Sequence, residues 1–166
     1  MTFDKNTCCC FTGHRALPTS GERPVILERL KNHIRRLYGK GFRTFLAGGA
    51  MGFDTYAAEA VLYLKREGLS ELRLVLVLPC GDQSARWSEA DRIIYERHKG
   101  EADEVIVLSE RYYDGCMRAR NAYMVEHSAA CIAYLTHSRS GAAQTVRMAR
   151  AAGIPVYNCA EPTAAV

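Results

Sequence analysis

Six short and almost continuously apolar runs recur along this chain, and longer segments with a helical period separate them. The runs are Cys8–Thr12, Arg43–Ala47, Arg73–Pro79, Glu104–Ser109, Ala130–Leu135 and Pro155–Cys159. A strand with one face in solvent alternates apolar and polar residues, whereas a strand covered on both faces does not. The pattern therefore predicts about six buried strands in a mostly parallel sheet.

The intervening segments carry the start and stop signals of helices. Pro24 suits a first helical turn, and the residues after it form an apolar stripe. Asp54 can cap a helix that ends near Glu67, because Gly68 follows it. Further helices are expected at Ser84–Lys99, Gly115–His127 and Gly141–Ala152. Strands that alternate with helices predict an α/β fold, a single Rossmann-like domain of three layers with helices on both faces of the sheet.

Composition narrows the class of protein further. A chain of 166 residues can bury one full core without disulfides or metals. The 22 Lys and Arg against 18 Asp and Glu leave a net charge of +4, too small to demand a polyanionic partner. No stretch approaches the roughly 20 apolar residues of a membrane span, so no membrane partner is expected.

The seven cysteines favour a reduced, cytoplasmic protein. Their number is odd, no pair has the C-x-x-C spacing of a zinc or redox site, and the first residues lack the apolar core of a signal peptide. Cys8, Cys9 and Cys10 are consecutive. In a strand they point alternately to the two faces, so packing alone can account for them.

Two loops after predicted strands carry candidate binding residues. In an open parallel sheet the ligand lies beyond the carboxyl ends of the strands, at a switch point in strand order. The first predicted strand leads into Thr12, Gly13, His14 and Arg15, and arginine suits bidentate contact with phosphate. A polar loop with a solvated arginine is the alternative.

The loop after the second strand contains Gly48, Gly49 and Gly52 and leads directly into a helix, which makes it a candidate anion site. Asp54 either caps that helix or accepts a ribose hydroxyl. Glu59 lies one turn beyond Thr55 and is either a surface carboxylate or a catalytic candidate.

The later loops add a second group of candidates. Trp87 either packs in the core or stacks on a base. Arg118 and Asn121 can project from one helical face toward a phosphate and a hydroxyl, whereas Arg120 is expected on solvated helix surface. Ser140 and Gly141 enter the last helix, with Thr145 one turn later, and form a second candidate anion cradle.

Several established motifs are missing from the sequence. It contains no G-x-G-x-x-G, no phosphate-loop lysine, no nucleophile elbow and no cluster with metal-ligand spacing. No metal and no cofactor is therefore expected, apart from a nucleotide-like ligand.

Together these segments resemble the YpsA-like family of the SLOG superfamily, which is related to the DNA-processing protein DprA and to the "lonely guy" cytokinin-activating enzymes. The resemblance extends from roughly Cys8 to Val156 and implies a single SLOG-type domain over residues 1–166, with a nucleotide-like ligand at the strand ends. It rests on Phe11–Arg15, the Gly48–Asp54 loop with Ala57–Glu59, Gln83 with Trp87, and the segment of Arg118, Asn121 and Met124.

The resemblance also implies which residues contact the ligand. Matched by position, they are Gly13, Arg15, Gly48, Gly49, Asp54, Arg118, Asn121 and the loop at Gly141. That loop reads Ser140-Gly141-Ala142 where the family typically has Gly-Gly-Thr, and Ser140 could replace the missing hydroxyl. The chain also lacks the P-G-G-x-G-T-x-x-E motif of the "lonely guy" enzymes, so N-glycosidase chemistry would need Asp54 or Glu59 instead.

Three functions follow as hypotheses. The first is a sensor or regulatory module that binds a nucleotide-derived, phosphorylated small molecule and passes its occupancy to a protein partner or a second copy of the chain. The second is a phosphoribohydrolase-type enzyme on such a ligand. The third is binding of single-stranded nucleic acid as in DprA, for which the charge of +4 is modest.

Overall fold

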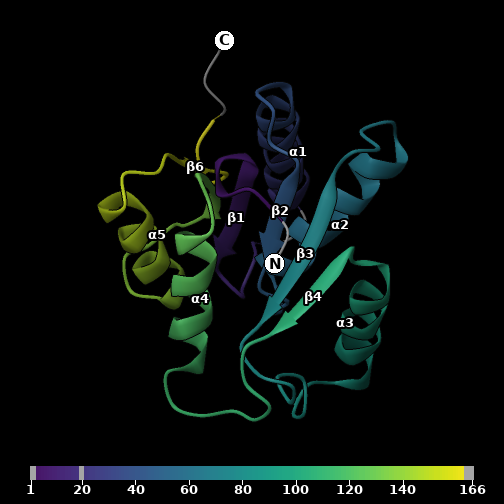
Figure 1. The fold of residues 1–166 in the computed structure, drawn as a ribbon, viewed down its shortest axis with the longest axis vertical. Coiled ribbons are helices and arrows are strands. Elements are labelled where there is room, and N and C mark those ends of the chain that lie inside the picture. The colour runs from purple at the N-terminus through teal and green to yellow at the C-terminus, as the bar shows by residue number, and fades with distance from the viewer. Residues whose placement is uncertain (1–2, 19–20, 163–166) are drawn as a thin grey trace.

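The computed structural model describes residues 3–18 and 21–162 and contains one parallel six-stranded sheet (Figure 1). The strand order is β4-β3-β2-β1-β5-β6. The strands are β1 (Cys8–Gly13), β2 (Thr44–Ala47), β3 (Arg73–Leu78), β4 (Glu104–Val107), β5 (Ala130–Tyr134) and β6 (Val156–Asn158). The chain adds β2, β3 and β4 on one side of β1, then crosses to place β5 and β6 on the other. The switch point therefore lies between β1 and β5.

Five α-helices cover the two faces of this sheet, as expected for a Rossmann-like α/β domain. They are α1 (Arg23–Gly39), α2 (Phe53–Arg66), α3 (Glu89–Glu101), α4 (Cys116–Glu126) and α5 (Gly141–Ala151). Figure 1 shows α4 and α5 on one face, and the apolar residues of α1, α2 and α3 pack on the other. No helix in the described ranges is both long and apolar enough to cross a bilayer.

The consecutive cysteines of β1 contribute to both cores. Cys9 belongs to the apolar cluster under α1 and α2, and Cys10 belongs to the cluster under α4 and α5. All seven cysteines of the chain are buried free thiols. This confirms that packing alone can account for the run, since a strand between two helical layers needs small apolar side chains on both faces.

Two helix starts differ from those predicted. Helix α3 begins at Glu89 rather than Ser84, because the Ser88 side chain caps it by accepting from the Asp91 N–H at 3.2 Å. Asp54 does not cap α2, so that prediction is wrong. The N-cap is Gly52, whose φ of 83° is favourable only for glycine, and Asp54 already lies within the helix.

Candidate functional site

A cavity of about 360 Å³ opens at the switch point between the carboxyl ends of β1 and β5. This switch-point cavity is formed by the loops that follow these two strands, the start of α2 and the first two turns of α4. Its lining includes two glycines, Gly13 and Gly141, and the polar residues Thr12, His14, Arg15, Asp54, Arg120, Asn121, His137 and Ser140. Its place is the one where open parallel sheets bind ligands.

The loops after β1 and β2 are locked together through their backbones. The Phe53 N–H donates to the His14 carbonyl oxygen at 3.1 Å. A Cβ atom on Gly52 would lie 2.5 Å from the Cα of Arg15 and 2.6 Å from its carbonyl carbon, so no side chain fits there. The position of Arg15 at the cavity is therefore fixed by the neighbouring loop as well as by β1.

A buried arginine organises the floor of the cavity. Arg120 is 5% exposed, and its Nη1 donates to the Gly48 carbonyl oxygen at 2.5 Å. Its Nε donates to Asn121 Oδ1 at 2.7 Å, which orients the amide of Asn121. A Cβ atom on Gly48 would lie 2.7 Å from Arg120 Cζ and 2.9 Å from Asp54 Oδ2. The glycine therefore lets a guanidinium and a carboxylate approach the same point of the backbone.

Asp54 lines the same cavity, and its carboxylate supports the glycine-rich loop. Its Oδ2 accepts from the Ala50 N–H at 3.3 Å. Burial raises the pKa of Asp54, and the nearby charge of Arg120 opposes this rise. A buried carboxyl with a raised pKa beside a cavity is a typical feature of functional sites.

His14 and His137 form a stacked pair in the cavity wall. Their rings are parallel within 5°, with centroids 4.2 Å apart. The Thr136 N–H donates to His14 Nε2 at 2.9 Å, so the proton of the neutral ring is on Nδ1. Burial, together with the positive charge that His137 can carry, lowers the pKa of His14. His14 is therefore a neutral residue with its Nε2 already used.

The amino end of α5 supplies backbone donors to the cavity. Ser140 caps this helix by accepting from the Ala143 N–H at 3.0 Å. The N–H groups of Gly141 and Ala142 have no acceptor within the described residues, and both residues line the cavity. Such N–H groups at the positive end of a helix dipole suit an anion.

Thr145 is not available to a ligand. Its hydroxyl is buried and donates to the Gly141 carbonyl oxygen at 3.0 Å. Arg15, in contrast, is exposed at the cavity, and its guanidinium has no hydrogen-bond or ion-pair partner in the described part of the chain. It is thus the side-chain cation that is free to meet an anionic ligand there.

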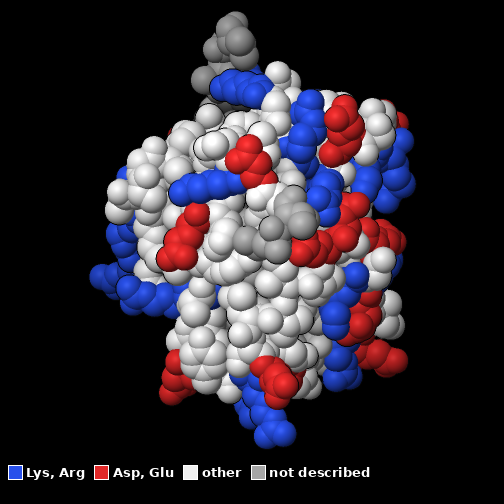
Figure 2. Space-filling model, in the orientation of Figure 1, with Lys and Arg blue, Asp and Glu red and all other residues white. Residues whose placement is uncertain are grey.

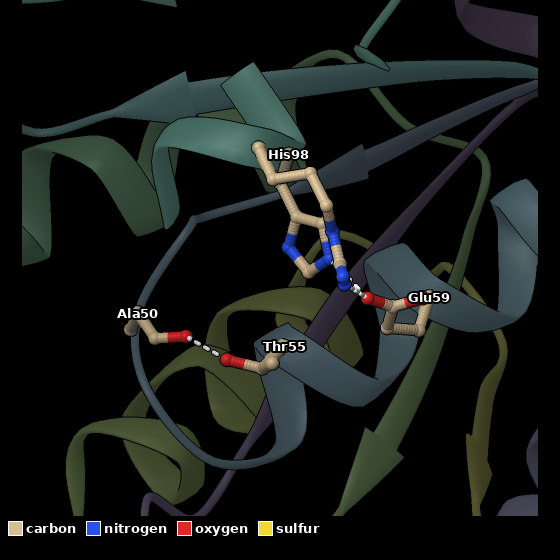
Figure 3. A network of polar contacts seen from close by, with 5 residues as sticks. Ala50, Thr55, Glu59 and His98 are labelled. Atoms are coloured by element: carbon tan, nitrogen blue, oxygen red, sulfur yellow. Dashed lines mark hydrogen bonds and ion pairs between the residues drawn. The ribbon is translucent and has the colours of Figure 1, made fainter. Parts of the chain in front are cut away.

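Glu59, the second catalytic candidate, lies outside the cavity on the other side of α2. It hydrogen-bonds His98 Nε2 at 2.7 Å and forms an ion pair with Arg97, which ties α2 to α3 (Figure 3). Partial burial raises the pKa of Glu59, but the hydrogen bonds and charges of His98 and Arg97 outweigh this and lower it. In the same view, the Thr55 hydroxyl donates to the Ala50 carbonyl oxygen at 3.3 Å.

The remaining predicted residues are placed around rather than in the switch-point cavity. Trp87 lines a neighbouring cavity with Gln83, and its ring packs edge-on against Tyr95 with centroids 5.0 Å apart. Gly49 lines a different, smaller cavity together with Asp54, and the Gly48 carbonyl oxygen accepts from Arg120. Arg118 is exposed and lines neither of these cavities.

The expectation that Arg120 lies on solvated surface is wrong, and the sequence contained the contrary signal. Cys116, Arg120 and Met124 recur at a spacing of four, and all three are buried. The two apolar residues could therefore have placed Arg120 on the inward face of the helix. The role of His137 had no such signal, because its stacking on His14 depends on two loops that are distant in sequence.

Comparison with known proteins places this chain in a family. The YpsA model, described as the YspA SLOG family, matches residues 10–152. A UPF0398 protein of Bacillus velezensis is 26% identical over 140 residues, which are 80% of this chain and 76% of the relative. A UPF0398 protein of Shouchella clausii is 25% identical over 116 residues, or 69% of this chain, and the match spans only 62% of that relative.

A solved structure shares the fold. DNA processing protein A of Helicobacter pylori, described for its mode of binding single-stranded DNA, superposes with a TM-score of 0.64 at 18% sequence identity. The match covers 93% of this chain and 65% of the DprA chain.

Proposed function

Because this chain belongs to the YspA SLOG family, we propose that it binds a nucleotide or nucleotide-derived phosphorylated small molecule in the switch-point cavity, as a sensor or regulatory module. The observation that carries the proposal is that one cavity is lined by the N–H groups of Gly141 and Ala142 and by the guanidinium of Arg15, none of which has a hydrogen-bond partner among the described residues. Backbone donors at a helix start and an unpaired arginine are a typical combination for phosphate.

The other polar groups of the cavity suit the rest of such a ligand. The Asn121 amide is oriented by Arg120, and the Thr12 hydroxyl lies at the end of β1. Both can contact a ribose or another neutral polar group next to the phosphate. A regulatory role is favoured over catalysis because Glu59 is paired outside the cavity and His14 Nε2 already accepts a hydrogen bond.

One observation supports a second candidate function, cleavage of an N-glycosidic bond in the ligand. Asp54 lines the cavity, and burial raises its pKa, as a general acid requires. We expect Asp54→Asn to leave ligand binding intact. If the protein turns over a nucleotide and this variant does not, the enzyme hypothesis replaces the sensor hypothesis.

The proposal is tested by comparing Arg15→Ala with Arg118→Ala. Both arginines are exposed, but only Arg15 lines the cavity, so Arg118→Ala is a matched control for loss of one surface charge. Purified protein is denatured and its extract is analysed for nucleotides by mass spectrometry, and binding of AMP, ADP, ATP and ADP-ribose is measured by calorimetry.

We expect Arg15→Ala to weaken binding by on the order of tenfold or more, because a hydrogen bond to a charged group is lost, and Arg118→Ala to bind as the wild type does. Equal binding by both variants, or no binding of any phosphorylated compound by the wild-type protein, would overturn the proposal.

A further inference from the structure

A second cavity of about 420 Å³ lies beside the switch-point cavity and shares two lining residues, Arg15 and Met117, with it. We call it the Trp87 cavity. It is formed by the segments that follow β3 and β4, and its other lining residues include Gln83, Arg86, Trp87 and Tyr112. A ligand bound through its phosphate at Arg15 therefore has a neighbouring site into which a second part can extend.

The two segments of the Trp87 cavity are held together as one wall. The Tyr112 N–H donates to Asp82 Oδ1 at 2.9 Å, and the Gly81 N–H donates to the Ser109 carbonyl oxygen at 2.9 Å. Tyr112 is 57% exposed although it is a large aromatic residue, and Trp87 is partly exposed. Trp87 is held by its edge-on contact with Tyr95. Aromatic rings presented in this way suit the face of a planar ring.

Gln83 adds a polar group with an unused acceptor to this wall. The residue is 9% exposed, and its Nε2 donates to the Gly48 carbonyl oxygen at 3.5 Å and faces the Tyr95 hydroxyl at 3.3 Å. Because a carbonyl oxygen can only accept, the contact with Gly48 fixes which end of the amide is the donor. Gln83 Oε1 is buried and has no hydrogen-bond partner among the described residues.

A buried acceptor without a donor is rare in folded proteins and calls for a specific explanation. We infer that the Trp87 cavity is a nucleobase subsite, in which Trp87 and Tyr112 contact the ring and Gln83 Oε1 selects a base with an N–H donor on its edge. This inference rests on the proposed function, since the phosphate of the same ligand would occupy the switch-point cavity.

The test measures separately how much the base and the phosphate of the ligand contribute to affinity. The probes are AMP, GMP, CMP and UMP, with purine riboside 5′-monophosphate as a nucleotide whose base has no N–H donor, and ribose 5-phosphate as a ligand with no base. Affinities are measured by calorimetry for the wild-type protein, Gln83→Met and Trp87→Leu. The melting temperature of each variant is recorded to show that it folds.

At least one of the four natural nucleotides should bind on the order of tenfold more tightly than purine riboside 5′-monophosphate, because a site built for a hydrogen bond rejects a ligand that lacks it. Gln83→Met should abolish this preference. Trp87→Leu should weaken every nucleotide and leave ribose 5-phosphate unchanged.

The base subsite is overturned if ribose 5-phosphate binds the wild-type protein as tightly as every nucleotide does, or if the preference survives Gln83→Met. These results still leave the phosphate site standing. If neither ribose 5-phosphate nor any nucleotide binds, the proposed function itself has failed, and the base subsite fails with it.

Discussion

At the scale of single residues, the guanidinium of Arg120 links more parts of the site than any ligand-facing side chain does. It joins α4 to the loop after β2 and orients Asn121, and its charge opposes the rise that burial causes in the pKa of Asp54. We expect Arg120→Met to lower the free energy of unfolding by about 3–5 kcal/mol, because it leaves a buried carboxylate without its compensating charge. Urea unfolding followed by circular dichroism measures this.

Arg118→Met provides the matched comparison, two residues away on the same helix. Its side chain is exposed, so the free energy of unfolding should change by no more than about 0.5 kcal/mol. Similar losses in the two variants would mean that Arg120 acts through the helix rather than through its buried contacts.

At the scale of elements, the site depends on how the loop after β2 enters α2. Gly52 combines a φ of 83° with close contact to the backbone of Arg15. We expect Gly52→Ala to cost about 1–3 kcal/mol of unfolding free energy through backbone strain, and to weaken nucleotide binding because Arg15 must shift.

Gly39→Ala is the control for this variant. Gly39 ends α1 without a positive φ, and a Cβ atom there would meet nothing within 4 Å. Its nucleotide affinity should match that of the wild type, and its unfolding free energy should not fall but rise by up to about 1 kcal/mol, because alanine lowers the conformational entropy of the unfolded chain. A Gly52→Ala protein with the stability and affinity of Gly39→Ala would contradict the interlocked loops described above.

The elements themselves were largely predictable from sequence, whereas the contacts between loops were not. Each predicted apolar run overlaps one observed strand. The prediction of burial holds for the four inner strands β1, β2, β3 and β5, but it is wrong for β4 and β6, which are only partly buried because they lie at the two edges of the sheet. The predicted start of α3, at Ser84, is five residues too early. Both Ser84 and Ser88 can cap a helix, and only the structure shows that Ser88 is the N-cap.

In the candidate site, too, the residues at the strand ends were predictable, whereas the contacts between distant segments were not. The strand ends correctly indicated Thr12–Arg15, Asp54, Asn121 and Ser140–Gly141 as neighbours. The contacts between segments distant in sequence, those of Arg120 with Gly48 and of His14 with His137, needed the structure.

At the scale of the whole molecule, the net charge is small and the charges of both signs are mixed on the face that Figure 2 shows. Lys and Arg are interspersed with Asp and Glu on the face shown in Figure 2, and the net charge is +4. The loops at the carboxyl edge of the sheet carry both arginines and carboxylates, among them Arg15, Asp82, Arg86, Glu110, Arg111, Asp114 and Arg139.

This distribution disfavours a groove that follows a nucleic-acid backbone. We expect a 20-nucleotide oligo(dT) to bind more weakly than the best mononucleotide at 150 mM salt, with a slope of log K against log salt shallower than about −2, because few phosphates would be neutralised. Fluorescence anisotropy over a salt titration measures both quantities. A slope steeper than this, with tight binding at 150 mM, would instead support DprA-like binding of single strands.

The interlocking of the loops after β1 and β2 also bears on how this protein can change over evolution. A side chain at Gly52 disturbs both loops at once, because it meets the backbone of Arg15. At this contact the phosphate-facing half of the site can therefore diverge only by concerted changes. The Trp87 cavity is formed by other segments, those that follow β3 and β4. Paralogues that exchange residues 80–88 can therefore acquire a new ligand while they keep the same phosphate site. A protein engineer can graft that segment for the same purpose.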